Sequence, residues 1–399
     1  MRGRPPSAFL SIGFRPFYLG AAVFAALSIP LWVAAYIGPV TITAAYAGFA
    51  WHTHEMLFGF APAIIAGFLL TAVRNWTGLP TASGPLLGSL FVVWLCGRFA
   101  PFIAPAPIAA LADLAFLPAL MLCIAVPLWR SRNRRNGFVV AVLLILWLCN
   151  AAFHGVQLQV LPPAFLAAAL ATARDLILLL MIVIGGRVIP AFSRNAIRGL
   201  EPRSWPWLER LSIGGVVVIA TLDAAGPWLS DGRYAWNGLY SALAYLVAGL
   251  HLLRLAGWQP WRTRGNLLLV MLPVSYAWIP IHLALRGWLE AAPGSLHPVA
   301  EHALFVGAMA GLMFSMMTRS ALGHTGHALR AGWVEATGFA LLQIAAVART
   351  AGPLAGPEVY RGALVVSAAV WSVAFALFAA AYAPLLLKPR PDTQSAPGS

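Results

Sequence analysis

The residues best suited to chemistry in this sequence are its histidines, and the richest segment runs from Trp51 to Met56. It holds two imidazoles, a carboxylate and a thioether. If the segment is helical, His52, Glu55 and Met56 share one face because they are spaced i, i+3 and i+4. His54 then points nearly the opposite way. One helix can therefore offer ligands to a cofactor on one side and to a second site on the other.

A second segment of this kind begins at His302. Gly307 and Gly311 form a GxxxG pattern, which lets another helix or a flat macrocycle approach the backbone. Four methionines continue along the same helix, namely Met309, Met313, Met316 and Met317. Core packing is the usual role of such a stripe, although thioethers also bind copper(I).

The two segments share a spacing. His54 and His302 each precede a glycine by five residues, at Gly59 and Gly307. If this register is structural, His54 rather than His52 is the partner of His302.

The elements that position these histidines are predicted to be membrane helices. Of the 399 residues, 60% are hydrophobic and 10% are charged, against about 25% charged in soluble domains. A bilayer core needs about 20 apolar residues per helix. Twelve such spans are predicted, at Phe17 to Ile37, Ala50 to Val73, Gly84 to Ile103, Pro107 to Trp129, Phe138 to Val160, Ala164 to Ile189, Trp207 to Ala225, Ala235 to Ala256, Asn266 to Leu285, Val299 to Thr318, Gly332 to Gly352 and Val359 to Leu387. The sequence therefore predicts an all-α polytopic membrane protein.

The basic residues set the orientation of these spans. Twenty Arg and Lys residues fall on one side and five on the other, so the first side and both termini are predicted to be cytoplasmic. Residues 1–388 then form a single transmembrane domain, and residues 389–399 a short disordered cytoplasmic tail. The net charge of +14 is scattered rather than gathered on one face, so the expected partner is the lipid bilayer and not nucleic acid.

With this topology six of the nine histidines lie near the periplasmic side: His52, His54, His154, His282, His297 and His302. Polar groups inside a membrane are costly and usually face a bundle interior, a cavity or a cofactor. Imidazole is a common ligand of haem iron, copper and zinc. One hypothesis is that these histidines, which lie at a similar depth, bind haem or a metal ion. The alternative is that they are interfacial residues hydrogen-bonded to water, lipid headgroups or backbone.

Other polar residues leave alternatives open. Glu55 is a candidate to orient a ligand, to relay protons or to pair with an arginine. Arg187 and Arg319, at the cytoplasmic ends of their helices, are candidates for cofactor binding, and His324 is a further metal candidate. The remaining acids in or near spans, Asp113, Asp175 and Glu335, fit either proton relay or helix pairing.

Several motifs together resemble the NnrS family, haem- and copper-containing membrane proteins of bacterial nitric oxide metabolism and nitrosative stress. They are Gly13 to Phe17, Trp51 to Gly59, Gly67 to Val73 with Asn75 to Gly78, Gly185 to Pro190, and Thr318 to Gly326. The resemblance covers nearly the whole chain. It implies twelve transmembrane helices, haem, copper and a role in coping with nitric oxide.

A weaker similarity links the chain to the catalytic subunit of haem-copper oxidases and nitric oxide reductases. In that superfamily a haem-ligating histidine is followed four residues later by methionine, as His52 is by Met56. By this analogy His52 and His302 are expected to be the axial ligands of a non-covalent, b-type haem. His54, His154 and His282 are then expected to serve copper.

These patterns give a first functional hypothesis: an inner-membrane protein that binds nitric oxide at a metal site near the periplasmic face. A nitric oxide reductase-like activity is part of this hypothesis, with quinol as the expected electron donor. One alternative is a twelve-helix transporter. Another is a non-catalytic sensor or chelator of nitric oxide and metal.

Overall fold

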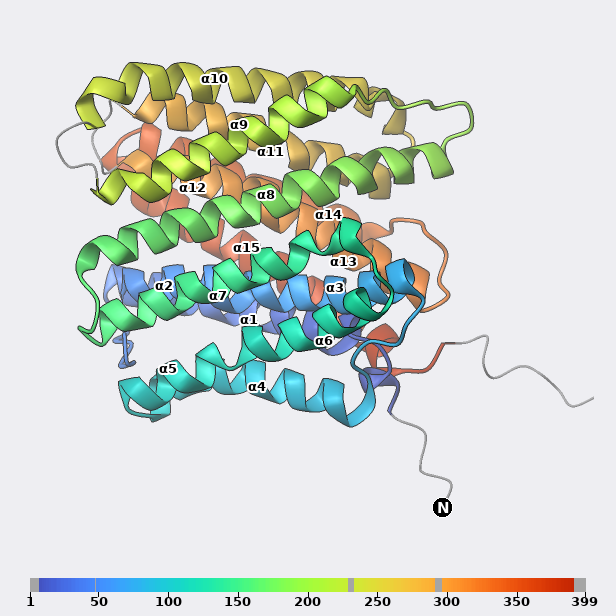
Figure 1. Cartoon of the computed structure of the whole chain (residues 1–399), viewed down its shortest axis with the longest axis horizontal. Coiled ribbons are helices and arrows are strands. Elements are labelled where there is room, and N and C mark those ends of the chain that lie inside the picture. The colour runs from blue at the N-terminus through green and yellow to red at the C-terminus, as the bar shows by residue number, and fades with distance from the viewer. Residues whose placement is uncertain (1–6, 47, 229–232, 291–295, 391–399) are drawn as a thin grey trace, which may run out of the picture. The chain divides into compact units, whose positions relative to one another are not determined.

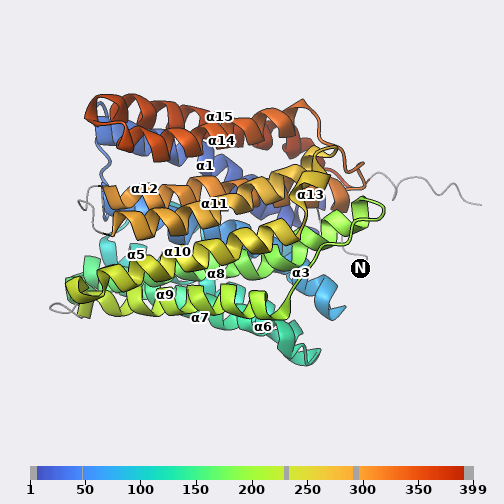
Figure 2. The same cartoon turned by 90° about the horizontal axis from the view of Figure 1, so that it is seen from above.

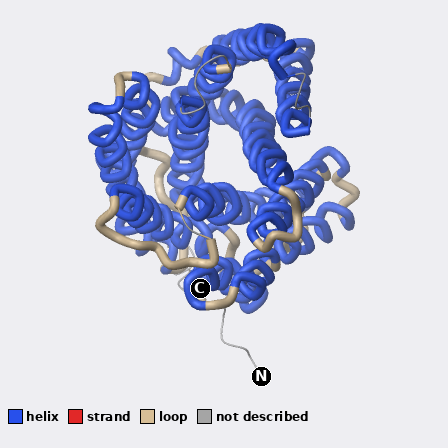
Figure 3. Tube along the Cα trace, turned by 90° about the vertical axis from the view of Figure 1, so that its left-hand side faces the viewer, coloured by secondary structure: helices blue, strands red, loops and turns tan. Residues whose placement is uncertain are grey.

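The computed structural model describes residues 7–46, 48–228, 233–290 and 296–390. Within these ranges the chain consists of helices and connecting loops, with no strand (Figure 3). This confirms the predicted all-α class. Most of the predicted tail, residues 391–399, lies outside the described residues.

Every predicted span corresponds to a helix or to a run of consecutive helices. Eleven spans in the described part of the chain are long and apolar enough to cross a membrane: Phe14–Ile37, Phe49–Thr77, Gly84–Ile103, Ala106–Arg130, Arg134–Gln157, Pro163–Ala196, Pro206–Trp228, Gly238–Gly257, Leu267–Leu289, His297–His324 and Pro357–Leu387. The twelfth predicted span is α14 (Trp333–Leu354). Helix α14 is not among the eleven, and its polar residues Glu335, Gln343 and Arg349 lower its mean hydropathy.

The helices fall into two compact units. Unit 1 comprises the described residues within 1–169, 317–329 and 375–399, and unit 2 those within 170–316 and 330–374. Unit 1 holds α1 (Phe14–Ile37), α2 (Phe49–His54), α3 (Ala61–Thr77), α4 (Gly84–Ile103), α5 (Ala106–Leu114), α6 (Phe116–Arg130) and α7 (Phe138–Gln157). Unit 2 holds α9 (Pro206–Ala225), α10 (Arg233–Gly257), α11 (Leu267–Leu289), α12 (His297–His302) and α14. Three helices have residues in both units, α8 (Pro163–Ala196), α13 (Gly311–His324) and α15 (Pro357–Leu387) (Figure 1).

In unit 1 the start of α1 lies beside the end of α15. The Arg15 guanidinium donates hydrogen bonds to the carbonyls of Leu386 at 2.8 Å and Lys388 at 2.7 Å. These carbonyls belong to the last turn of a helix or follow it, where backbone acceptors lack intrahelical partners. The first helix therefore begins at the end of the unit where the last helix ends.

In unit 2, α10, α11 and α12 run side by side (Figures 1 and 2). A side chain at Gly307 would collide with the Trp278 ring, and one at Gly311 with Ser275. Side chains of α11 therefore lie against the GxxxG pattern, which fits helix packing at these two glycines.

Two short π-helical segments interrupt the long helices. One, η2 (Glu55–Phe60), joins α2 to α3, and the other, η7 (Ala303–Ala310), joins α12 to α13. His54 and His302 are the residues immediately before them. The equal register of the two histidines is therefore structural, and π-helical turns are frequent at functional sites.

Candidate metal centre

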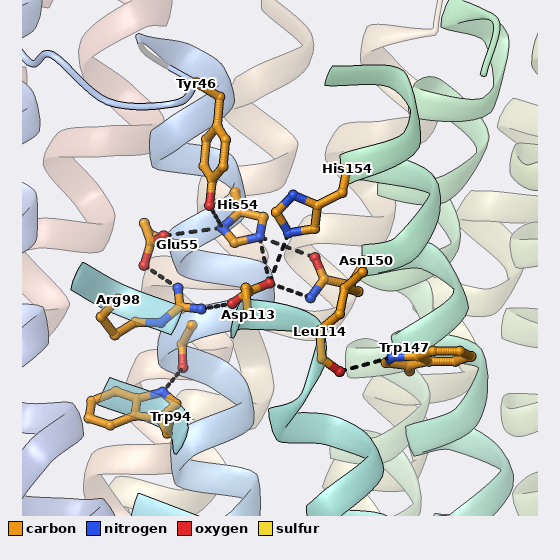
Figure 4. Close-up of polar contacts among 11 residues, drawn as sticks. Tyr46, His54, Glu55, Trp94, Arg98, Asp113, Leu114, Trp147, Asn150 and His154 are labelled. Carbon is orange, nitrogen blue, oxygen red and sulfur yellow. Dashed lines mark hydrogen bonds and ion pairs between the residues drawn. The ribbon is translucent and has the colours of Figure 1, made fainter. Parts of the chain in front are cut away.

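A buried cluster of polar side chains lies in unit 1, at the end of α2 (Figure 4). Four of its members are ionisable or imidazole groups on different helices, and all are at most 5% exposed: His54, Arg98, Asp113 and His154. Asn150 lies one helical turn before His154 on α7, so both side chains reach the same point. Burial on this scale is unusual for charged residues unless they are paired.

Asp113 is at the centre of the cluster (Figure 4). Its Oδ2 lies 3.1 Å from His54 Nε2, 3.0 Å from His154 Nε2 and 2.7 Å from Asn150 Nδ2. Its Oδ1 accepts a hydrogen bond from Arg98. Arg98 and Asn150 donate to this carboxylate whatever the tautomers of the two imidazoles, so it is paired although it is removed from water.

Arg98 joins the centre of the cluster to Glu55. One of its nitrogens pairs with Asp113 and another with Glu55. The connection between α4 and α5 is only two residues long, so these helices run antiparallel and bring Arg98 and Asp113 together.

Two glycines make room for this arrangement. A Cβ at Gly59 would collide with the Arg98 guanidinium, and a Cβ at Gly97 would lie 2.9 Å from Asp113 Oδ1. The Trp94 indole also donates to the Gly59 carbonyl at 3.0 Å. The π-helical segment thus supplies Glu55. It also supplies Gly59, whose lack of a side chain lets the Arg98 guanidinium contact Glu55.

The outer nitrogen of His54 has two oxygen partners. His54 Nδ1 lies 3.1 Å from Glu55 Oε1 and 3.1 Å from the Tyr46 hydroxyl. Burial raises the pKa of the Tyr46 phenol, and the carboxylates of Glu55 and Asp113 raise it further. Tyr46 is therefore a neutral hydroxyl that can donate or accept.

The inner face of the cluster has the composition of a metal site. His54, Asp113 and His154 each offer one ligand atom, and these atoms all lie within 4.8 Å of one another. Imidazole and carboxylate ligands bind zinc or copper at about 2.0–2.2 Å, so a common ion needs donor atoms only about 3–4 Å apart. Two nitrogens and one oxygen from buried side chains fit such an ion, which would take the place of the hydrogens between them.

The groups that contact the second ring nitrogen of His54 also fit a metal site. Ligating histidines usually donate their second ring nitrogen to a carboxylate, which fixes the tautomer and raises the ligand's basicity. Glu55 is placed to do this for His54. Pairing with an arginine, one of the roles open to Glu55, is shown by the structure, and it coexists with the contact to His54.

His52 packs against α1, but Glu55, which the i, i+3 spacing had placed on the same face, contacts His54 instead. The reason is that the chain becomes π-helical at Glu55. The His52 ring stacks on Trp32, with centroids 4.1 Å apart and planes 20° apart. Met56 is buried in the first turn of η2. His52 and Met56 stay candidates for a haem contact in unit 1.

Three further candidates lie in unit 2. The Nδ1 of His302 is hydrogen-bonded to the carbonyl of Pro298, one turn earlier in the helix. A bond of this type fixes the tautomer of a ligating imidazole. His282 is fully buried and its Nδ1 donates to the carbonyl of Ala300 at 2.7 Å. Arg187 is exposed.

The glycines before Arg187 have a different partner. A Cβ at Gly186 would collide with the Arg254 guanidinium, which donates to the carbonyl of Ile182 at 2.9 Å. The lack of a side chain at Gly186 therefore leaves room for Arg254 of α10.

The candidates that were predicted to be cytoplasmic lie at the end of α13 in unit 1. Arg319 is half-buried, and the exposed His324 packs its ring on Phe14 at 5.5 Å. The methionines of η7 and α13 are mostly buried, Met309 and Met317 at 1% exposure or less. Burial of this kind matches core packing.

Sequence reasoning did not place Arg98, Asn150 and Tyr46 in the site, and it left Asp113 undecided. In the predicted topology Arg98 is only one of the five basic residues on the less basic side. The usable signal was that a basic and an acidic residue, Arg98 and Asp113, stand at facing ends of consecutive spans, where unpaired charge is costly.

The other undecided acids have structural partners. In unit 2 Arg174 and Arg286 pair with Asp175 and Asp223, and Arg174 also pairs with Glu301 at 2.8 Å. Glu335 accepts the backbone N–H of Gly332 at 2.6 Å and so caps α14. For Asp175 and Glu335, helix pairing and capping account for the charge.

The fold and the cluster together define a multi-pass helical membrane protein with a buried His/Asp/His group suited to a metal ion. The comparison with protein families matches residues 8–390 to the NnrS protein family. The chain belongs to that family, as the motifs predicted. A search of curated proteins found no match.

Proposed function

We propose that this chain binds nitric oxide, and reduces it, at a copper ion held by His54, Asp113 and His154. The observation that carries the proposal is the approach of two imidazoles and one carboxylate within 4.8 Å in a buried, membrane-embedded cluster. Membership of the NnrS family supports the link to nitric oxide. A copper ion with an open coordination position would supply the binding and electron transfer.

The protein's own residues would have separate tasks. Glu55 would keep the His54 ring in one tautomer, and Arg98 would hold Glu55 and Asp113 in place. The Tyr46 hydroxyl oxygen lies 3.1 Å from His54 Nδ1. Because reduction of nitric oxide consumes protons, a neutral hydroxyl beside the site is a suitable local donor.

A non-covalent haem is proposed as the second cofactor, with His52 of unit 1 and His302 of unit 2 as separate candidate ligands. His54, the counterpart of His302 in register, belongs instead to the cluster with Asp113 and His154. The Nδ1 contact of His302 fits the role of a haem ligand. Quinol is the proposed electron donor. The site is proposed to face the periplasmic side of a bacterial inner membrane, where an apolar gas arrives freely through the lipid.

The test is metal analysis and spectroscopy of detergent-purified protein. We expect copper and haem in the wild type, and a haem absorption or copper signal that changes on addition of nitric oxide. His54→Gln and His154→Gln should lose copper, whereas His297→Gln, an exposed histidine of unit 2, should keep it. Wild-type levels of copper in the first two variants would contradict the assignment.

Turnover separates a reductase from a binding protein. A nitric oxide electrode with a quinol reductant should record consumption by the wild type and little by His54→Gln. Binding without consumption would instead make the protein a sensor or chelator.

A transporter is the second candidate, because the structure shows a repeated feature. The π-helical segments η2 and η7 follow histidines in equal register, and internal repeats with broken helices are typical of carriers. Copper-free, haem-free protein from copper- and haem-supplied cells would favour this candidate.

A further inference from the structure

The charges around the candidate metal centre limit the kind of ion it can hold. The ionised side chains that contact His54, Asp113 and His154 in the described part of unit 1 are Arg98 and Glu55. Counting Asp113, the cluster has two negative charges and one positive charge. Its net charge is therefore −1 when both imidazoles are neutral, the form in which they ligate a metal.

We infer that this site selects a monovalent metal ion, copper(I), over divalent ions, and that Arg98 is the residue that sets this preference. The inference rests on the proposed function, since it names the ion of that same site. A monovalent ion makes the cluster neutral, whereas a divalent ion leaves one positive charge buried. Net charge is costly in a group of side chains that are at most 5% exposed inside membrane helices.

The ligand types alone do not choose between these ions. Two imidazoles and a carboxylate without sulfur suit zinc(II) and copper(II) as well as copper(I). The fixed charge of Arg98 therefore decides between ions that the donor atoms alone would accept.

Arg98 is built into the site as a permanent cation. It is 5% exposed, and both of its carboxylate partners are at most 2% exposed. The space for its guanidinium depends on the missing side chain at Gly59. A guanidinium stays protonated over the ordinary range of pH.

The experiment measures the relative affinity for copper(I) and zinc(II) in purified full-length protein and three variants. Arg98→Gln should shift the preference toward zinc(II) by roughly 10- to 100-fold, the range typical of groups next to metal ligands. Glu55→Gln should shift it toward copper(I). The double variant should return close to the wild type, because its net charge is again −1.

The double variant separates charge from structural damage. If the two changes only disturb the fold, their effects add and both metals are lost; if they act through charge, their effects cancel. Cancellation supports the inference. Single-variant shifts in the same direction, or no shift in Arg98→Gln, overturn it.

The same measurement distinguishes this inference from the proposed function. Wild-type protein that binds neither metal refutes both. Wild-type protein that binds metal through His54 and His154, but with a preference that does not respond to Arg98, refutes the selection by charge alone.

Discussion

The substitution Gly59→Ala tests whether the bare backbone of η2 is needed for the site. In an ordinary helix alanine is favoured over glycine by about 1 kcal/mol. At this position the new Cβ would lie 2.8 Å from Glu55 Oε2 and 3.0 Å from the Arg98 Cζ, and closer still to a guanidinium nitrogen. Neither side chain can swing away without losing the ion pair between them.

The magnitude follows from which contact gives way. If Arg98 moves, a buried ion pair is broken, which typically costs about 3–5 kcal/mol. If the backbone moves, overpacking costs about 1–3 kcal/mol. After subtraction of the gain in helix propensity, we expect Gly59→Ala to lose up to about 4 kcal/mol of stability. Copper content should fall with it, because Arg98 also holds Asp113.

A matched control is available in α9. A Cβ at Gly214 meets nothing within 4 Å, so Gly214→Ala should be neutral or stabilising by up to about 1 kcal/mol. Thermal unfolding of both variants in detergent, with copper analysis of each, gives the comparison. If Gly59→Ala is as stable as Gly214→Ala and keeps its copper, the described passage of Arg98 across η2 is wrong.

Three other changes test the site and its surroundings. Asp113→Asn keeps the volume but removes the charge of a ligand, so copper affinity should fall at least 10- to 100-fold in a chelator competition; unchanged affinity would exclude Asp113 as a ligand. Arg286→Met leaves Asp175 and Asp223 of unit 2 with one cation fewer, and should lower stability by about 3–5 kcal/mol without changing copper content. His297→Gln, at an exposed position whose Nε2 contacts the Leu289 carbonyl, should change stability by no more than about 1 kcal/mol and leave copper bound, so copper loss there would place the site elsewhere.

The fold was predictable because membrane helices are specified locally. Each span needs about 20 apolar residues, and the breaks between them are marked by Pro, Gly and charged residues. The predicted limits of the third span, Gly84 to Ile103, are those of α4. The sixth span was predicted to end at Ile189, but α8 continues to Ala196, because Pro190 is tolerated inside a membrane helix.

The site was only half predictable because its two halves have different causes. His54 and His154 stand out as imidazoles at similar depth in apolar spans. Their shared partner Asp113 is on a third helix, and nothing in its local sequence shows that its Oδ2 faces both rings. Such contacts depend on helix rotation, which a periodic apolar pattern does not fix to the accuracy of one side chain.

The comparison of His54 with His302 shows what an identical spacing can and cannot predict. In both places a histidine precedes a π-helical segment, and a glycine lies five residues later. At Gly59 the neighbouring side chain is Arg98, whereas at Gly307 it is the indole of Trp278. The residue after the histidine is an acid in the first segment, Glu55, and alanine in the second. The shared spacing therefore predicts a similar backbone conformation at the two places. Which ligand each place can bind depends on the side chain that the neighbouring helix packs against the glycine. For this reason we expect substitution of Arg98 to change the metal preference of the unit 1 site. The histidine spacing, which is the same in unit 2, does not set that preference.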